Sequence, residues 1–378
     1  MLWEHPVTRR LAPPFRADHV GSLLRPPALL AARRDLAAGR ISPDDLRAVE
    51  DAAVRDVVSM QEHLGLQSIT DGEFTRHAWQ MDFIFAIHGI EKAEQGLSVE
   101  FRNRQGTLEF TSAAIRIADR LRLTTTIFGE AFARLRRNVT AGTPKLTIPS
   151  PSMVHYWGGR AVRESAVYAD IDQFWDDLVA VYREEIRRLG ALGCTYLQLD
   201  DTSLSYLNDP RQRQRIRDMG GDPTRQHIEY IDHINAVLAG RPAGMAVTVH
   251  TCRGNFRSSW IAEGSYDFVA EALFSDLQVD GFFLEYDDDR SGSFAPLRFV
   301  PSGKCAVLGL VTTKYGELEG KDAVKRRIDE ASRHLPLEQL CLSPQCGFSS
   351  TSEGNALTYD QQLAKLGLVV EIAREVWG

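Results

Sequence analysis

A histidine and a cysteine stand two residues apart at the end of an apolar run, in the segment VTVHTCRGNF. On a β-strand, residues two apart point to the same face, with Cα atoms roughly 6.5–7 Å apart. His250 and Cys252 could therefore reach one metal ion, because zinc accepts both imidazole and thiolate ligands. An isolated pair also fits a buried cysteine beside a hydrogen-bonded histidine, so a metal site requires further ligands elsewhere in the chain.

Two further potential ligands follow other apolar runs. Glu285 lies at the end of GFFLEY, and Cys346 lies in SPQCGF after another run. Together with His250 and Cys252 they would form a tetrahedral zinc site whose ligands are distant in sequence. The other cysteines precede or begin their predicted strands, so we expect them to pack at the opposite end. These three are Cys194, Cys305 and Cys341.

This ligand set favours one type of reaction. Two thiolates and one carboxylate bring three negative charges to a divalent ion, and such a site is a poor Lewis acid for generating hydroxide. It is better suited to a substrate thiol, because a free thiol with a pKa of about 8.5 is mostly protonated at neutral pH and a metal-bound one is not. The pattern indicates zinc-activated thiol alkylation and argues against a zinc hydrolase.

The predicted ligands need a scaffold that gathers the ends of distant strands. Short apolar runs alternate with helical patterns, and parallel neighbouring strands require such crossovers. Eight strands close a barrel, whereas no glycine-rich dinucleotide-binding turn supports an open doubly wound sheet. The predicted strands are 15–22, 68–73, 145–151, 195–201, 244–252, 281–287, 305–311 and 339–347. Predicted helices begin at Pro26 and after the caps Ser42 and Thr358, and cover about 171–189, 224–239 and 321–334.

We therefore predict an α/β fold, a (β/α)8 TIM barrel, with residues 1–378 as a single domain and 1–14 as an N-terminal extension. A long insertion separates the second and third strands, and within it the alternation over 108–123 predicts a hairpin. Catalytic groups of such barrels lie at the carboxyl ends of the strands, which is where the four predicted ligands fall.

Composition limits the class of protein. The chain has 378 residues, 43% hydrophobic and 25% charged, with a net charge of −7 and no long basic block, so nucleic acid is not an expected partner. No uninterrupted apolar stretch reaches the roughly 18 residues of a membrane span, so no membrane partner is expected. Five cysteines without framework spacing argue against a disulfide scaffold. We predict a cytoplasmic location.

The chain resembles the catalytic C-terminal barrel of cobalamin-independent methionine synthase and the single-barrel relatives of that enzyme. The resemblance runs from HVGSLLRP to the final helix, and its most specific motifs are H-x-C, FFLEYDDDRSG and SPQCGF. It implies that zinc is the cofactor and that homocysteine and a methyl donor are the substrates. The zinc ligands that it implies are His250, Cys252, Glu285 and Cys346.

The same resemblance implies residues that bind the substrates. HVGS is similar to an I-G-S turn that contacts homocysteine, which implies Val20 and Ser22. DGE and LQLDD resemble motifs whose carboxylates hold the amino group, implying Glu73 and Asp200; a desolvated ammonium needs such compensating charge. Trp157 aligns with a tryptophan that stacks on the pterin of the donor, although a core tryptophan is the alternative.

The sequence also departs from the family pattern. The additional N-terminal barrel of the full-length enzyme and its folate-contacting Y-G-S-R segment have no counterpart, and residues 74–144 replace the latter. The family's general-acid histidine is missing from LVTTKYGELEG, where Lys314 is the nearest protonatable group. Releasing a folate nitrogen requires a proton, so Lys314 is the candidate acid and the folate donor is in question.

We predict a zinc-dependent methyltransferase that makes methionine from homocysteine, with 5-methyltetrahydrofolate or a methylated corrinoid protein as donor. One alternative is an enzyme of the epoxyalkane:coenzyme M transferase type. Its sulfonate thiol would favour cations such as Arg25 and Arg76, whereas Glu73 and Asp200 favour an amino acid. A second alternative is a zinc-stabilised barrel with a binding or regulatory role and no methyltransferase activity.

Overall fold

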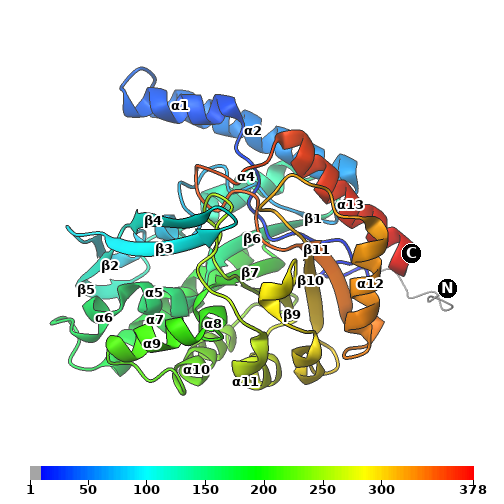
Figure 1. Ribbon diagram of the computed structural model, residues 1–378. Coiled ribbons are helices and arrows are strands. Elements are labelled where there is room, and N and C mark those ends of the chain that lie inside the picture. Colours follow the sequence, from blue (N-terminus) through cyan, green and yellow to red (C-terminus); the bar gives the residue numbers. More distant parts are fainter. Residues whose placement is uncertain (1–9) are drawn as a thin grey trace.

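Seven parallel strands form the central sheet of the computed structural model, which describes residues 10–378. The first nine residues of the predicted N-terminal extension lie outside this range. The strand order is β1–β6–β7–β8–β9–β10–β11, and the curled sheet with helices outside it is consistent with a TIM-like barrel in a single mixed α/β domain (Figure 1). The strands are β1 (Ser68–Ile69), β6 (Thr143–Pro149), β7 (Tyr196–Asp201), β8 (Ala246–Thr251), β9 (Gly281–Glu285), β10 (Cys305–Val311) and β11 (Leu340–Pro344).

The first predicted strand, residues 15–22, is not a strand of this sheet. It forms one isolated parallel bridge to β11, in which the Asp18 N–H donates to the Leu342 carbonyl at 3.0 Å. The Asp18 carboxylate accepts the backbone N–H groups of Phe15 (3.1 Å) and His19 (2.8 Å). Such local side-chain bonds compete with a strand ladder, which explains why the prediction of an eighth strand was wrong.

The alternating segment 108–123 forms two strands, but the predicted hairpin between them was wrong. β4 pairs antiparallel with β3, and β5 pairs antiparallel with β2. The chain reverses at Arg104 and Gln105, so that Asn103 at the end of β3 pairs with Gly106 at the start of β4. Only Ala113 and Ala114 separate β4 from β5, and the Ala114 carbonyl accepts the Ala93 N–H at 2.9 Å, which continues the β2–β5 pairing instead of turning the chain back onto β4. The strands are β2 (His88–Lys92), β3 (Leu97–Asn103), β4 (Gly106–Ser112) and β5 (Ile115–Arg122).

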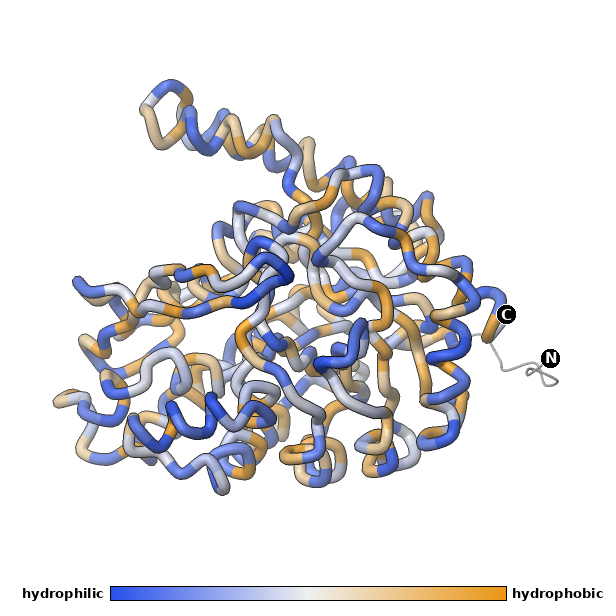
Figure 2. The backbone as a smooth tube through the Cα atoms, viewed as in Figure 1, coloured by the Kyte–Doolittle hydropathy of each residue, from blue (hydrophilic) through white to orange (hydrophobic). Residues whose placement is uncertain are grey.

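The predicted helix starts are confirmed. Ser42 and Thr358 each form a capping box, which satisfies backbone N–H groups that a helix start otherwise leaves unpaired. In Figure 2 the outer helices alternate between hydrophilic and hydrophobic residues, as expected for helices that bury one face. The α-helices are α1 (Pro27–Ala37), α2 (Pro43–Leu64), α3 (Met81–Ile84), α4 (Gly129–Asn138), α5 (Pro151–Gly158), α6 (Arg160–Arg163), α7 (Ile171–Ala191), α8 (Ser203–Tyr206), α9 (Pro210–Asp218), α10 (Gln226–Leu238), α11 (Ala270–Asp276), α12 (Lys321–Ser332) and α13 (Tyr359–Trp377).

The core lies between the sheet and these helices. All seven residues of β10 are buried, as are all five of β9 and of β11, which is typical of parallel strands covered on both faces. Cys305 and Cys341, the first residue of β10 and the second of β11, lie in a separate small apolar cluster with Val20, Phe283 and Val307. Cys194 precedes β7 and lies in the main core, and all three cysteines are buried and form no disulfide, as expected. Within residues 10–378, no helix combines the length and apolar character needed to cross a bilayer.

Candidate metal centre and its pocket

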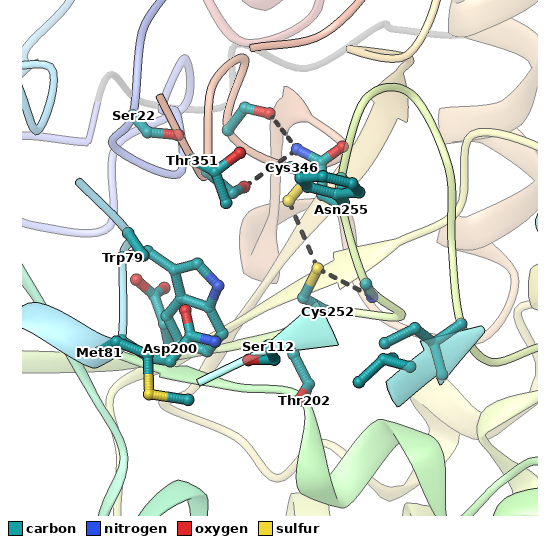
Figure 3. A pocket seen from close by; sticks show the side chains of 18 of the residues that line it. Ser22, Trp79, Met81, Ser112, Asp200, Thr202, Cys252, Asn255, Cys346 and Thr351 are labelled. Atoms are coloured by element: carbon teal, nitrogen blue, oxygen red, sulfur yellow. Dashed lines mark hydrogen bonds between the residues drawn. The ribbon is translucent and has the colours of Figure 1, made fainter. Parts of the chain in front are cut away.

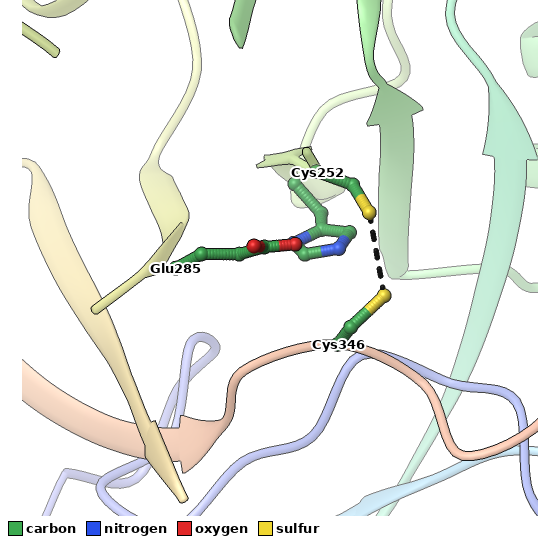
Figure 4. Close-up of side chains that lie close together, drawn as sticks. Cys252, Glu285 and Cys346 are labelled. Atoms are coloured by element: carbon green, nitrogen blue, oxygen red, sulfur yellow. Dashed lines mark hydrogen bonds between the residues drawn. The ribbon is translucent and has the colours of Figure 1, made fainter. Parts of the chain in front are cut away.

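The four predicted metal ligands meet at one point. His250 is the fifth residue of β8, Cys252 follows that strand, Glu285 ends β9, and Cys346 lies two residues beyond β11. One potential ligand atom of each residue lies within 4.8 Å of those of the other three, and all four residues are buried (Figure 4). The parallel register of β8, β9, β10 and β11 creates this cluster, because it brings the carboxyl ends of these strands to the same rim.

The residues of the cluster fit a divalent metal. Both ring nitrogens of His250 and the Oε2 atom of Glu285 are buried without a hydrogen-bond partner among the described residues. Such atoms are rare in folded proteins unless a metal, ligand or water contacts them. Imidazole, two thiols and a carboxylate together make a donor set that zinc accepts. The site can therefore hold a metal ion.

The two thiols of the cluster interact directly. Their sulfur atoms are 3.4 Å apart. The hydrogen bond from Cys252 lowers the pKa of Cys346 to about 5 against the effect of burial, and His250 acts in the same direction as Cys252. The same hydrogen bond, together with burial, raises the pKa of Cys252 well above its usual range. The cluster thus already favours one thiolate.

Arg253 and Tyr266 support the cluster, and the sequence reasoning missed both. The Arg253 backbone N–H donates to Glu285 Oε1 at 3.0 Å, and its guanidinium donates to the Glu285 carbonyl at 3.1 Å. The Tyr266 hydroxyl accepts the Glu285 backbone N–H at 2.9 Å, and the Tyr266 ring lies against the Arg253 guanidinium, 4.3 Å from its central carbon. Burial alone would raise the pKa of Glu285, but the cations of Lys314, Arg253 and Arg290 lower it. The only available signal was the position of Arg253 directly after Cys252.

The substrate residues predicted from the sequence line a single cavity of about 240 Å³ beside the cluster. In Figure 3, Ser22, Asp200, Cys252 and Cys346 surround one pocket together with Trp79 and Met81. The structure thus brings the substrate residues and three of the four potential ligands together. The predicted residues on its wall are Val20, Ser22, Glu73, Trp157, Asp200, His250, Cys252 and Cys346.

Glu73 and Asp200 form the acidic part of this wall. Glu73 adopts a left-handed backbone conformation (φ 60°), which is strained for a residue with a side chain. Its Oε1 atom accepts a hydrogen bond from Thr147 at 2.9 Å, whereas its buried Oε2 atom has no partner among the described residues. Burial raises the pKa of Glu73, against Arg76 and Arg25, and raises that of Asp200 to about 7. These carboxyl groups are placed to receive a cation.

Lys314 lies apart from this wall. Its ammonium group is buried and donates to the Gly254 carbonyl at 3.3 Å, in the loop that follows Cys252. It is not among the residues that line the cavity. The role of Lys314 as an acid therefore stays a prediction.

The fold and site define the class of protein: a TIM-like barrel with a buried His-Cys-Glu-Cys cluster at the carboxyl ends of its strands. Residues 15–375 match the family model of the cobalamin-independent synthase catalytic domain. The chain belongs to this family.

Individual relatives agree with this assignment. The chain is 45% identical to the uncharacterised protein YxjH of Bacillus subtilis over 365 residues, 96% of this chain and 95% of that protein. It is 26% identical to the methionine synthase of Pyrococcus abyssi, over 94% of this chain and 92% of that protein. The crystal structure of a Listeria monocytogenes protein, provisionally assigned as a vitamin-B12-independent methionine synthase, superposes with a TM-score of 0.76 at 36% identity, covering 98% of this chain and all of that one. These similarities support a methyltransferase of this family.

Proposed function

We propose that this protein is a zinc-dependent methyltransferase that converts homocysteine to methionine in the cytoplasm. One observation carries the proposal: the buried cluster of four potential metal ligands adjoins a cavity whose wall holds two buried carboxyl groups, Glu73 and Asp200. A thiol group and an ammonium group on one small molecule match these two features. Homocysteine has both.

In this proposal His250, Cys252, Glu285 and Cys346 would hold zinc, which supplies a positive charge that lowers the pKa of a substrate thiol. The chain's own residues position the amino acid. Glu73 lines the cavity and its buried Oε2 atom has no partner among the described residues, and Asp200 lies beside His250 on the neighbouring strand.

Burial of the site contributes to the transfer in two ways. It excludes water from the sulfur, and it strengthens the attraction between the carboxylates and the ammonium group. Holding the sulfur at a defined place on the cavity wall also converts a bimolecular encounter into an oriented one.

The arginines that would favour a sulfonate thiol are already engaged. Arg25 donates to the carbonyl and hydroxyl of Ser349 at 2.9 and 2.7 Å, and Arg76 donates to the hydroxyl and carbonyl of Thr147 at 3.1 and 2.8 Å. Neither arginine lines the cavity. This placement favours homocysteine over coenzyme M.

X-ray absorption at the zinc edge tests the proposal. We expect the purified zinc-loaded protein to show two sulfur neighbours, and to gain one more when L-homocysteine is added. Coenzyme M serves as the comparison thiol and should leave the spectrum unchanged. A spectrum that homocysteine does not alter would overturn homocysteine as the acceptor, and the absence of stoichiometric zinc would overturn the metal assignment.

A further inference from the structure

The β3–β4 hairpin, together with the aromatic rings beside it, builds the part of the cavity wall that is here called the outer half, and the proposed function does not use it. Val99 and Phe101 of β3 and Phe110 and Ser112 of β4 line the cavity. These residues alternate along each strand, so one face of the hairpin turns toward the cavity while neighbours such as Thr111 are exposed. In Figure 1 the hairpin reaches from the side of the sheet toward its centre.

The hairpin is attached to the loop that follows Cys252 of the metal cluster. The backbones of Arg102 and Trp260 exchange two hydrogen bonds, at 2.7 and 2.8 Å. The Asn103 side chain donates to the Ser259 hydroxyl at 3.0 Å. These contacts fasten β3 to the segment that follows Cys252, so the hairpin forms a fixed wall on the outer side of the site.

Aromatic rings complete this wall. The ring of Phe256, four residues beyond Cys252, lies 5.3 Å from the ring of Phe101 and 4.3 Å from that of Phe110. Trp79 and Trp157 also line the cavity. Closely spaced rings of this kind bind flat apolar groups well, through both buried area and stacking.

The outer half carries no charged side chain. Among the described residues, the wall has five ionisable side chains besides the Tyr206 phenol, and all of them belong to the metal cluster or the acidic pair: Glu73, Asp200, His250, Cys252 and Cys346. Apart from the atoms of Glu73 and His250, three buried polar atoms of the wall have no hydrogen-bond partner among the described residues: Trp157 Nε1, Gln80 Oε1 and Asn255 Oδ1. Two acceptors and one donor can orient an uncharged ligand, but they offer no cation to an anionic group.

We propose that this outer half binds the methyl donor and that the donor is a small, uncharged, flat molecule that enters the cavity as a whole. This inference rests on the proposed function, whose acceptor takes the inner half. The whole cavity has a volume of about 240 Å³, which is below the usual range of drug-sized ligand pockets. A corrin macrocycle on a carrier protein is far larger than the remaining space. The hairpin thus selects against that donor.

Methyl 4-nitrobenzenesulfonate is a suitable probe because it is flat, uncharged and carries a transferable methyl group. The homocysteine sulfur forms a bond to the methyl carbon, and the bond from that carbon to the sulfonate oxygen breaks. The sulfonate leaves with the bonding electron pair, and the thiol proton is released to solvent. The reaction needs no oxidant, reductant or further reactant.

We would measure methionine formation by the zinc-loaded protein with homocysteine and increasing probe, and separately with methylcobalamin. We expect saturable transfer from the probe and none from methylcobalamin. Phe110→Ala should raise the KM for the probe about tenfold, since it removes a stacking surface. Thr111→Ala, on the exposed face of the same strand, should leave the KM unchanged. Transfer from methylcobalamin at a similar rate, or an unchanged KM in Phe110→Ala, would overturn the inference.

A binding measurement separates this inference from the proposed function. The unreactive analogue 4-nitrobenzenesulfonamide should quench the tryptophan fluorescence of the protein saturably without homocysteine, and Phe110→Ala should weaken its binding about tenfold. If the analogue binds in this way but homocysteine never reaches the zinc, only the proposed acceptor fails. If homocysteine alters the zinc spectrum but the analogue does not bind, only the donor site fails.

Discussion

Cys346 and Cys305 are chemically identical residues whose positions give them different roles. Cys346 lies in the metal cluster at the carboxyl end of the sheet, with its sulfur 3.4 Å from that of Cys252. Cys305 begins β10 and is buried at the opposite end. Composition does not separate them, but their places along the strands do.

Replacing Cys346 should remove the metal. We expect Cys346→Ser to lose most of its zinc and all methyl transfer, because a neutral hydroxyl is a much weaker ligand than a thiolate. The matched variant Cys305→Ser should keep both. Zinc per chain, measured by mass spectrometry after dialysis, distinguishes the two variants, and full zinc content in Cys346→Ser would refute the ligand assignment.

Asp200 should affect the amino acid rather than the metal. We expect Asp200→Asn to raise the dissociation constant for homocysteine roughly tenfold or more, since a hydrogen bond to a charged group contributes about 1.5–3 kcal/mol. Zinc content should stay unchanged, because Asp200 is not one of the four clustered residues. Calorimetric titration with homocysteine measures this effect. Loss of zinc would instead indicate a structural role.

At the level of secondary structure elements, segment 15–22 is held in place mainly by hydrogen bonds of the Asp18 side chain and not by the backbone pairing of a strand. The Asp18 carboxylate accepts the Lys145 ammonium at 3.1 Å and the Tyr196 hydroxyl at 2.8 Å. Asp18 and Lys145 are both fully buried. The segment is therefore joined to β6 and β7 through a polar network inside the sheet, in addition to its single bridge to β11.

This network makes a prediction about stability. Asp18→Ala should lower the free energy of unfolding by about 3–5 kcal/mol, because it leaves the Lys145 charge buried without a partner. The double variant Asp18→Ala/Lys145→Met should recover a large part of that loss, since the unpaired charge is gone. Urea unfolding at neutral pH measures both. Equal losses in the single and double variants would show that the ion pair is not the cause.

At the scale of the whole molecule, two buried histidines should make the fold sensitive to acid. Burial lowers the pKa of His155 to about 3 and that of His19 to about 4, and nearby cations add to this effect. In the unfolded chain both take up protons below a pH of about 6.5. The unfolded state therefore binds more protons than the folded state between these values, and stability is lost as the pH falls through this range.

The expected loss is about 2 kcal/mol per histidine between pH 7 and pH 5. His155→Gln should lose about 2 kcal/mol less of its free energy of unfolding between pH 7 and pH 5 than the original protein does. The variant is also less stable at pH 7, because it loses the 2.9 Å contact between His155 and the Tyr230 hydroxyl. Urea unfolding of both proteins at the two pH values gives the difference directly. The same slope in the variant and the original protein would contradict the assignment.

Much of the arrangement could be predicted because its signals are local. The capping residues Ser42 and Thr358, the apolar strands and the residues at strand ends all depend on neighbours in sequence. Parallel strands must place their carboxyl ends together, so the clustering of His250, Cys252 and Cys346 could also be anticipated. The cytoplasmic location stays a prediction.

The parallel α/β scaffold, the four candidate ligands and the negative charge that favours a thiol over water as the activated group can all be inferred from residue types and their spacing. Three features became clear only from the folded chain. Asp18 makes side-chain hydrogen bonds in place of a strand ladder, β4 pairs with β3 rather than with β5, and the resulting hairpin lines the cavity with uncharged aromatic side chains. The physical reason is that these features depend on contacts between residues far apart in the chain. Strand pairing and the competition of side chains for backbone groups leave no periodic signal in the sequence.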